Sequence, residues 1–243
     1  MAATRIPSPA NRLLGALPSI DRHRVLAHCD EVELLFSRVL NHPGNALEHV
    51  YFPLTCFISV IMPIDDTSLE VGLIGSEGMF GTPLALRVKA SPMLAIVQGA
   101  GSALRMRASS FRRELARSGA LQREIDRYVF VRVNQLAQMA GCTRFHVIEA
   151  RLARWLLMTQ DRARAETFHV TQEFLAVMLG VRRVGVTKAA RSLRERKLIR
   201  YTRGELTVLD RRGLKAASCG CYDEDRRSYE RILGYSSVTP VRL

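Results

Sequence analysis

The sequence lacks the features of secreted, membrane-spanning and disulfide-bonded proteins. Its 243 residues include five cysteines, an odd number without a Cys-x-x-Cys pair, which favours reduced thiols over a disulfide framework. The first 18 residues contain no uninterrupted apolar core before their prolines, so no signal peptide is expected. The longest apolar run, Tyr51 to Met62, is shorter than the roughly 20 residues that a spanning helix needs. These absences predict a soluble, cytoplasmic protein without a membrane partner.

Motifs for catalysis and for cofactor binding are also missing. The sequence holds no GxSxG, HExxH, Walker or GxGxxG motif, and the histidines of its N-terminal part show no metal-ligand spacing. The pair Cys219 and Cys221 is too isolated in the sequence to assign as a metal or redox site. Ordinary thiols are therefore expected there, and a redox role is left open. The sequence predicts no enzyme, no metal site and no cofactor.

Acidic residues are too few to balance the basic ones. The chain has 36 Lys and Arg against 23 Asp and Glu, a net charge of +13, while 47% hydrophobic residues indicate a globular protein. Residues 144–243 hold 21 of the basic and 11 of the acidic side chains, which leaves a net charge of +10 in that part alone. Proteins with such an excess usually bind phosphate backbones or anionic membranes.

The N-terminal part, residues 1–110, is predicted to begin with two short helices and to continue as strands. Runs of β-branched and aromatic residues alternate there with glycine, proline and aspartate turns. The expected strands are Val32–Leu40, His49–Phe52, Cys56–Met62, Leu69–Ile74, Met93–Val97 and Ala103–Met106. Short strands at this spacing predict an antiparallel β-roll or jelly roll, a fold that often encloses a small ligand.

Residues 111–141 are predicted to form a long connecting helix, because proline is absent from Phe111 to Met139. Apolar residues recur there at spacings of three and four. The stripe comprises Leu121, Ile125, Tyr128 or Val129, Arg132, Leu136 and Met139. It could pair with its copy in a dimer, with Arg132 as an imperfection, or pack along its own β-domain. Gly141 is expected to end this helix, and another helix is expected from Arg144 to Gln160.

The stretch from Thr171 to Ile199 predicts a helix-turn-helix within a C-terminal domain of residues 142–243. Thr171 is a suitable N-cap, and Gly180 can adopt the positive φ of a sharp turn between two helices. The second helix is expected over residues 182–196. Val186, Ala189, Ala190 and Leu193 share one side of it, and basic side chains share the opposite side.

A predicted hairpin follows the two helices directly. Leu198–Tyr201 and Leu206–Leu209 are expected strands, joined by the turn 202–205 with Arg203 at its tip. A helix-turn-helix followed by a small hairpin is a winged helix, which predicts double-stranded DNA as the partner. The alternative is that the basic side chains form only a solvated helix face.

The motif TQEFLAVMLGVRRVGVTKAARSLRERKLI resembles the helix-turn-helix of the Crp–Fnr family of bacterial transcription regulators. The order of parts also resembles that family along nearly the whole chain. The resemblance implies an α+β fold that combines an N-terminal cyclic-nucleotide-binding-like β-roll, a long dimerisation helix and a C-terminal winged helix-turn-helix. It implies a homodimer on a pseudo-palindromic site, admits RNA polymerase as a partner, and leaves the small-molecule effector unknown.

Each predicted DNA contact has a chemical reason. Arg183 can bind guanine O6 and N7 bidentately, and it matches the family's guanine-reading arginine. Lys188 matches a second basic contact to a base. Val184 can contact a thymine methyl group, although it stands where many members carry a glutamate. The remaining contacts are expected to involve phosphates. The predicted DNA-binding residues are Thr171, Arg182, Arg183, Val184, Thr187, Lys188, Arg191 and Arg203.

The effector region departs from the family pattern. Members that bind cyclic AMP carry Gly-Glu-Leu and later Arg-Ser/Thr-Ala, whereas this chain has Gly81-Thr82-Pro83 and Ser91-Pro92-Met93. The N-terminal cysteine cluster of the oxygen-sensing members is missing as well. The alternative hypothesis is a cyclic-nucleotide-responsive regulator in which Arg87 and Lys89 substitute for the phosphate-binding arginine.

Overall fold

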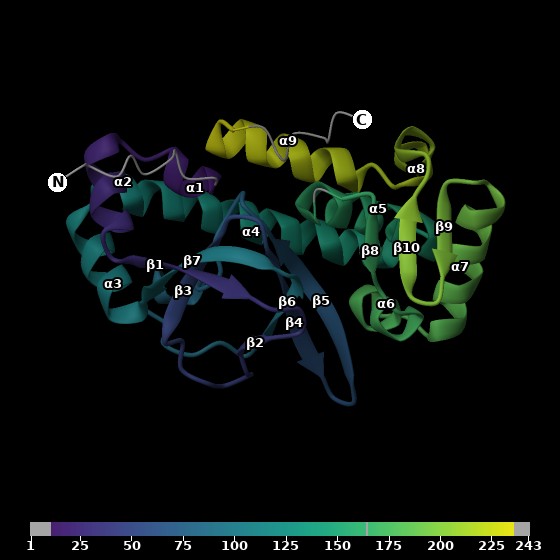
Figure 1. The fold of residues 1–243 in the computed structure, drawn as a ribbon, viewed down its shortest axis with the longest axis horizontal. Helices are drawn as coiled ribbons and strands as arrows, with labels where there is room; N and C mark the ends of the chain where they lie inside the picture. Colours follow the sequence, from purple (N-terminus) through teal and green to yellow (C-terminus); the bar gives the residue numbers. More distant parts are fainter. Residues whose placement is uncertain (1–10, 164, 236–243) are drawn as a thin grey trace. The chain divides into compact units, whose positions relative to one another are not determined.

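The structure, a computed structural model, describes residues 11–163 and 165–235 (Figure 1). These residues divide into two compact units. Within the described part of the chain, residues 11–59 and 74–130 form the first unit, and residues 60–73 and 131–235 form the second. Within the same residues, no helix combines the length and the apolarity that a membrane crossing requires. The sequence-based segments 1–110, 111–141 and 142–243 stay predictions of domain boundaries.

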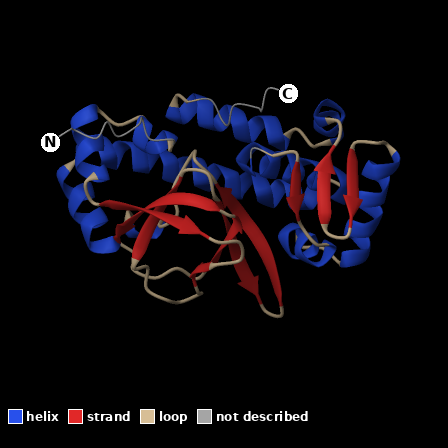
Figure 2. Ribbon diagram, viewed as in Figure 1, coloured by secondary structure: helices blue, strands red, loops and turns tan. Residues whose placement is uncertain are grey.

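Antiparallel strands form two sheets in the N-terminal part, which confirms the predicted β-roll (Figure 2). One sheet has the order β1-β7-β3, and the other has the order β2-β6-β4-β5. Two short helices, α1 (Arg12–Gly15) and α2 (Ser19–Leu26), precede the strands, and a 3₁₀ turn, η1 (Thr82–Leu84), lies between β5 and β6. The strands are β1 (Cys29–Leu34), β2 (Val39–Asn41), β3 (His49–Pro53), β4 (Phe57–Ile64), β5 (Thr67–Ile74), β6 (Leu94–Gly99) and β7 (Gly101–Arg107).

The run Val32–Leu40 is not the single strand that its composition predicts. β1 ends at Leu34 and β2 begins at Val39, in the other sheet. Ser37 between them has a φ of 63°, in the left-handed region, and its N–H donates to Val97 O at 2.8 Å. The backbone therefore changes direction within a run whose composition suggests one strand, because strand propensity does not specify where the backbone turns.

The predicted long helix is interrupted near its start. The structure has α3 (Ala108–Arg117) and α4 (Gly119–Phe145), separated by Ser118 with extended φ and ψ of −117° and 102°. Ser118 Oγ accepts from Leu121 N at 3.1 Å and donates to Asp21 Oδ1 at 2.6 Å. The side chain thus caps α4, as serine commonly does at helix N-termini. The prediction of one helix from Phe111 was wrong because this cap ends α3.

Gly141 does not end α4, contrary to the sequence prediction. The helix continues to Phe145, and the next helix, α5 (Ile148–Ala163), begins later than the expected Arg144. Among the described residues, no atom outside the neighbouring residues and the backbone of α4 itself lies within 4 Å of the position that a Cβ on Gly141 would occupy. A glycine in a helix costs only about 1 kcal/mol relative to alanine, so a long, otherwise regular helix continues through it.

The first half of the predicted stripe of α4 packs within its own unit. Leu121, Ile125 and Tyr128 are fully buried, and Tyr128 Oη donates to Met79 O at 3.2 Å. The next stripe residue, Arg132, belongs to the second unit and lies against Gly72 of β5. Leu121, Ile125 and Tyr128 thus pack along the chain's own β-domain, one of the two alternatives for this stripe, whereas Leu136 farther along is 38% exposed.

The second unit contains the C-terminal helices and a small antiparallel sheet of order β8-β10-β9 (Figure 1). Helix α5 packs against α7 and α8, and α6 packs against α7. Trp155 of α5 is buried, as expected for a core residue, and its Nε1 donates to Glu70 Oε1 at 2.9 Å. The elements are β8 (Thr167–His169), α6 (Gln172–Leu179), α7 (Arg183–Glu195), β9 (Ile199–Thr202), β10 (Glu205–Val208), α8 (Arg211–Ala217) and α9 (Cys221–Leu233).

Candidate DNA-binding interface

The two helices of the predicted helix-turn-helix are α6 and α7, and local hydrogen bonds define their turn. Thr171 Oγ1 accepts from Phe174 N at 3.1 Å, which makes it the N-cap of α6. Gly180 ends α6 with φ and ψ of 59° and 46°. A Cβ there would come within 2.8 Å of Leu69 Cδ1, so both the backbone conformation and the space favour glycine. The buried Arg151 of α5 donates to the last carbonyl of α6, Leu179 O.

Helix α7 is anchored by one apolar side. Its buried residues are Val186, Ala189, Ala190 and Leu193. Gly185 lies close to α5, because a Cβ at this position would be 2.8 Å from Ile148 Cδ1. The glycine, which lowers helix propensity, therefore permits the close approach of α5 and α7. The rest of α7 is left free to face solvent.

All eight predicted DNA-binding residues are exposed. Three of them, Thr171, Arg183 and Arg203, line one recess together with Glu173 and Tyr201. The recess joins the N-cap of α6, the first residue of α7 and the turn between β9 and β10. The other five do not line it and lie along α7 or immediately before it. They are Arg182, Val184, Thr187, Lys188 and Arg191.

Several of the predicted contact residues already have partners within the protein. Arg183 Nη1 lies 2.7 Å from Glu173 Oε1, and both side chains are more than half exposed. Thr187 Oγ1 is within hydrogen-bond distance of Gln172 Oε1, at 2.7 Å, and of Arg183 O, at 3.1 Å. Exposed ion pairs of this kind contribute little to stability. They hold the side chains in place without preventing an exchange for DNA partners.

The turn between β9 and β10 has the geometry of a tight hairpin. Arg203 and Gly204 have φ values of 51° and 85°, and Thr202 pairs with Glu205 across the turn. Two successive positive φ values match a type I′ turn, which suits the twist of a two-stranded hairpin. The arginine is therefore presented at the tip of the wing, as the sequence predicted.

Tyr201 and Glu173 were not selected from the sequence as site residues. Tyr201 Oη donates to Val170 O at 2.7 Å, and burial together with the nearby carboxylate of Glu173 raises the pKa of Tyr201 to about 12. The phenol thus stays neutral at physiological pH. Glu173 could be recognised only as an acid in the first turn of a helix, and its pairing with Arg183 depends on the angle between α6 and α7.

The region that departs from the cyclic-nucleotide pattern, from Gly81 to Met93, includes a 3₁₀ turn. Gly81 has a φ of 108°, and Thr82-Pro83 begin the 3₁₀ turn η1. Arg87, with a φ of 62°, and Lys89 are both exposed. Neither observation assigns them to an enclosed phosphate site, and the cyclic-nucleotide alternative stays a hypothesis.

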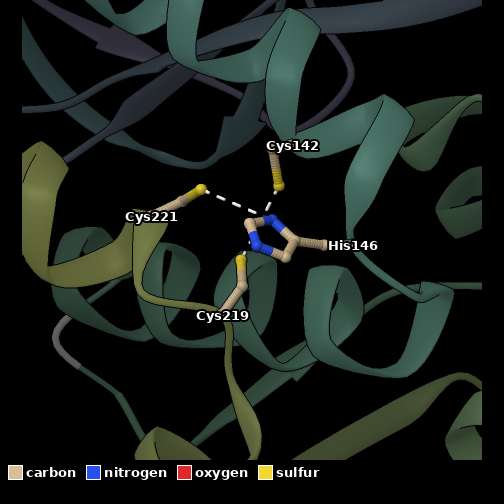
Figure 3. Close-up of side chains that lie close together, drawn as sticks. All are labelled: Cys142, His146, Cys219 and Cys221. Carbon is tan, nitrogen blue, oxygen red and sulfur yellow. Dashed lines mark hydrogen bonds between the residues drawn. The ribbon is translucent and has the colours of Figure 1, made fainter.

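A group of potential metal-ligating side chains lies in the same unit. Cys142, His146, Cys219 and Cys221 have their ligand atoms within 4.8 Å of one another (Figure 3). Sequence analysis treated Cys219 and Cys221 as isolated thiols, because Cys142 is 77 residues from Cys219 in the chain. Only the packing of α9 near α4 brings the four together.

Comparison with known proteins agrees with this architecture. Residues 150–217 match the model of the Crp-like helix-turn-helix domain. The c-di-GMP-responsive global regulator CLP of Xanthomonas campestris is 16% identical, with a TM-score of 0.65 over 79% of this chain and 99% of that chain. A putative crp/fnr-family transcriptional regulator from Eubacterium rectale is 14% identical, with a TM-score of 0.68 over 86% and 98% of the two chains.

FixK2 from Bradyrhizobium japonicum is a third similar structure. It is 13% identical and has a TM-score of 0.65 over 79% of this chain and 98% of that chain. No curated protein matches the sequence at a significant level. At these identities the solved structures show a shared fold, and the family model shows that the C-terminal part is a Crp-like helix-turn-helix domain.

Proposed function

We infer that this chain, a DNA-binding transcription regulator of the Crp–Fnr type, recognises a specific double-stranded site through α7 and the β9–β10 turn. The observation that supports this most is the exposure of all eight predicted contact residues, five of them on α7, whose opposite side is buried. A helix anchored in this way can enter the major groove with its N-terminal residues near base edges. No catalytic step is part of this proposal.

The residues divide into base-reading and phosphate-binding groups. Arg183, at the start of α7, reads guanine, and Lys188, five residues later, provides a second cationic contact to a base. Val184 is 60% exposed and can contact a thymine methyl group. The backbone contacts position the duplex without reading it. They come from Thr171, Arg182, Thr187, Arg191 and Arg203.

The ion pair between Arg183 and Glu173 gives the free protein a resting arrangement. A bidentate contact to guanine requires the planar guanidinium, so Arg183 must leave Glu173 at least in part when DNA binds. Because both side chains are exposed, the exchange replaces one weak pair with a more specific one. Glu173 therefore reduces binding to DNA that offers no guanine at the right position.

We also propose a homodimer that uses a face of α4 other than the stripe predicted from the sequence. Phe130 and Val133 are each 55% exposed, and Ala137 and Ala140 are exposed farther along the helix. Their spacings of three and four residues form a continuous apolar seam, as in coiled coils. A two-fold pair of α4 helices would present two recognition helices to half-sites about 34 Å apart.

The decisive experiment compares base-reading and phosphate-binding variants on a site selected from random DNA. Arg183→Ala is expected to weaken binding to the selected site by about fivefold to 150-fold, which corresponds to about 1–3 kcal/mol, and to weaken binding to random DNA much less. Arg203→Ala should weaken both by a similar factor and reduce the salt dependence. Equal losses on both DNAs for Arg183→Ala would refute the base-reading role.

A further inference from the structure

Four potential metal ligands meet where the end of α4 lies near the start of α9. Cys142 is in the last turn of α4, and His146 follows that helix directly. The backbone N–H of His146 donates to Cys142 O at 3.1 Å. Cys219 lies in the link between α8 and α9, and Cys221 is the first residue of α9. All four belong to the second unit, and their side chains point toward one another (Figure 3).

The distances fit a single tetrahedral ion. The Sγ atoms of Cys142 and Cys219 are 3.6 Å apart, and Cys221 Sγ is 3.6 Å from His146 Nδ1. An ion with Zn–S bonds of about 2.3 Å and a Zn–N bond of about 2.0–2.1 Å has ligand atoms about 3.5–3.8 Å apart if its geometry is tetrahedral. The four ligand atoms already lie within 4.8 Å of one another, so small rotations complete the arrangement.

Two other uses of the cysteines fit these distances less well. A disulfide requires sulfurs about 2.05 Å apart, far closer than the 3.6 Å between Cys142 and Cys219. An iron–sulfur cluster distributes its ligands over different irons, which spreads the thiolates farther than one ion does. A compact set of three sulfurs and one nitrogen favours a mononuclear site.

The surroundings suit an ion held by three thiolates. Cys142, Cys219 and Cys221 are 1%, 7% and 9% exposed, so bound metal would be shielded from water on that side. A divalent ion with three thiolates and a neutral histidine carries a net charge of −1. The positive charge of Arg154 acts on all three cysteines, and its buried Nε has no hydrogen-bond partner among the described residues.

We propose that Cys142, His146, Cys219 and Cys221 form a closed Zn²⁺ site. Four protein ligands fill a tetrahedral ion and leave no open position, so the site is structural rather than catalytic. Bound metal ties the α8–α9 link and the start of α9 to the end of α4. Because α8 follows the wing directly, the ion would stabilise the unit that carries the DNA-binding surface.

The test begins with the full-length protein purified under reducing conditions. Elemental analysis is expected to find one zinc per chain. After the zinc is removed by a chelator, added Co²⁺ should produce the intense visible absorption of a tetrahedral thiolate site, which the zinc protein lacks. The double variant Cys142→Ser/Cys219→Ser should lose both signals, whereas the matched double variant Cys29→Ser/Cys56→Ser, outside the group, should keep them. Failure of the purified protein to bind added Zn²⁺ or Co²⁺ would overturn the proposal, as would iron as the bound metal.

A second variant separates loss of metal from loss of the fold. The side chain of His146 is exposed, so His146→Ala leaves no buried cavity. This variant is expected to bind Zn²⁺ at least tenfold more weakly, while its circular dichroism after chelation matches that of the chelated wild-type protein. Unchanged affinity would remove His146 from the ligand set. Arg183→Ala should retain a full equivalent of zinc, so failure of the DNA-binding proposal would leave the metal result unaffected.

Discussion

The carboxylate of Glu173 competes with DNA for the guanidinium of Arg183 in the proposed interface. Its Oε1 is 2.7 Å from Arg183 Nη1 on the exposed surface. Glu173→Gln removes the ion pair and a negative charge from a surface proposed to face phosphates. We expect tighter binding to both selected and random DNA, with the larger, several-fold gain on random DNA, and hence lower specificity. Titrations by fluorescence anisotropy at fixed salt would measure both affinities.

The same titration with a double variant separates the two contributions of Glu173. If release of Arg183 contributes, the gain from Glu173→Gln should be smaller in the Arg183→Ala background than in the wild-type background. An identical gain in both backgrounds would show that Glu173 acts only by its charge.

Gly185 is explained by one neighbouring methyl group. A Cβ at this position would be 2.8 Å from Ile148 Cδ1, whereas glycine in a helix costs about 1 kcal/mol relative to alanine. In wild-type protein, Gly185→Ala should change the free energy of unfolding little, because the gain in helix propensity offsets the cost of displacing the Ile148 side chain. In an Ile148→Val background, which lacks Cδ1, the same change should stabilise by about 0.5–1 kcal/mol. Urea unfolding of the four proteins would test this, and equal effects in both backgrounds would contradict it.

At the scale of elements, Ser118 separates α3 from α4. Its Oγ accepts from Leu121 N at 3.1 Å and donates to Asp21 at 2.6 Å. Ser118→Ala should lower the free energy of unfolding by about 1–2 kcal/mol, because it removes a buried cap. Ser110→Ala, within α3, is the matched control and should change stability by less than about 0.5 kcal/mol. Equal effects in denaturant unfolding would refute the capping role.

Asp225 makes the contact between α4 and α9 sensitive to pH. Gln135 Nε2 donates to its Oδ1 at 2.6 Å, and burial raises the pKa of Asp225 above its usual 3.8, despite the opposing charge of Arg162. The folded state thus binds the proton more tightly than the unfolded state. The protonated Asp225 therefore stabilises the folded state at low pH. This contribution is lost as pH rises from about 3.8 through the raised pKa of Asp225.

Asp225→Asn should therefore keep the hydrogen bond from Gln135, and it should remove the loss of stability that follows deprotonation of Asp225. We expect a higher Tm than that of the wild-type protein at pH 7 and a flatter dependence of Tm on pH. Asp223→Asn, at a half-exposed position of the same helix where the carboxylate pairs with Lys215, should leave the dependence of Tm on pH nearly unchanged. A lower Tm for Asp225→Asn at pH 7 would show that the charge is needed by its arginine neighbours.

At the scale of the whole molecule, the exposed seam of α4 predicts the oligomeric state. Val133→Asp places a charge in the proposed dimer seam at a position that is 55% exposed. The variant should fold with an unchanged Tm at concentrations where both proteins are monomeric. It should sediment as a monomer and lose most of its affinity for a two-half-site DNA. Ile20→Asp, at an exposed position of α2, should remain dimeric.

The sequence alone determined those features that depend on neighbours along the chain. The β-roll and the winged helix followed from residue periodicity and from turn residues, and the cap at Thr171 and the left-handed Gly180 lie where local chemistry placed them. The exposure of the predicted contact residues within α7 followed from the amphipathic pattern of that helix. Their contacts with DNA stay predictions. Local patterns sufficed here because each is enforced within a few residues.

The tertiary structure decided what depends on distant partners. Which stripe of α4 is covered depends on distant parts of the chain, such as the loop residues Gly78 and Met79 against which Tyr128 lies, and apolar spacing alone fits more than one face. The break at Ser118 depends partly on Asp21, 97 residues away. The meeting of Cys142 with Cys219 depends on the path of the chain through the whole winged domain. The spacing of residues along the chain does not indicate which distant segments come together, so only the folded structure shows these contacts.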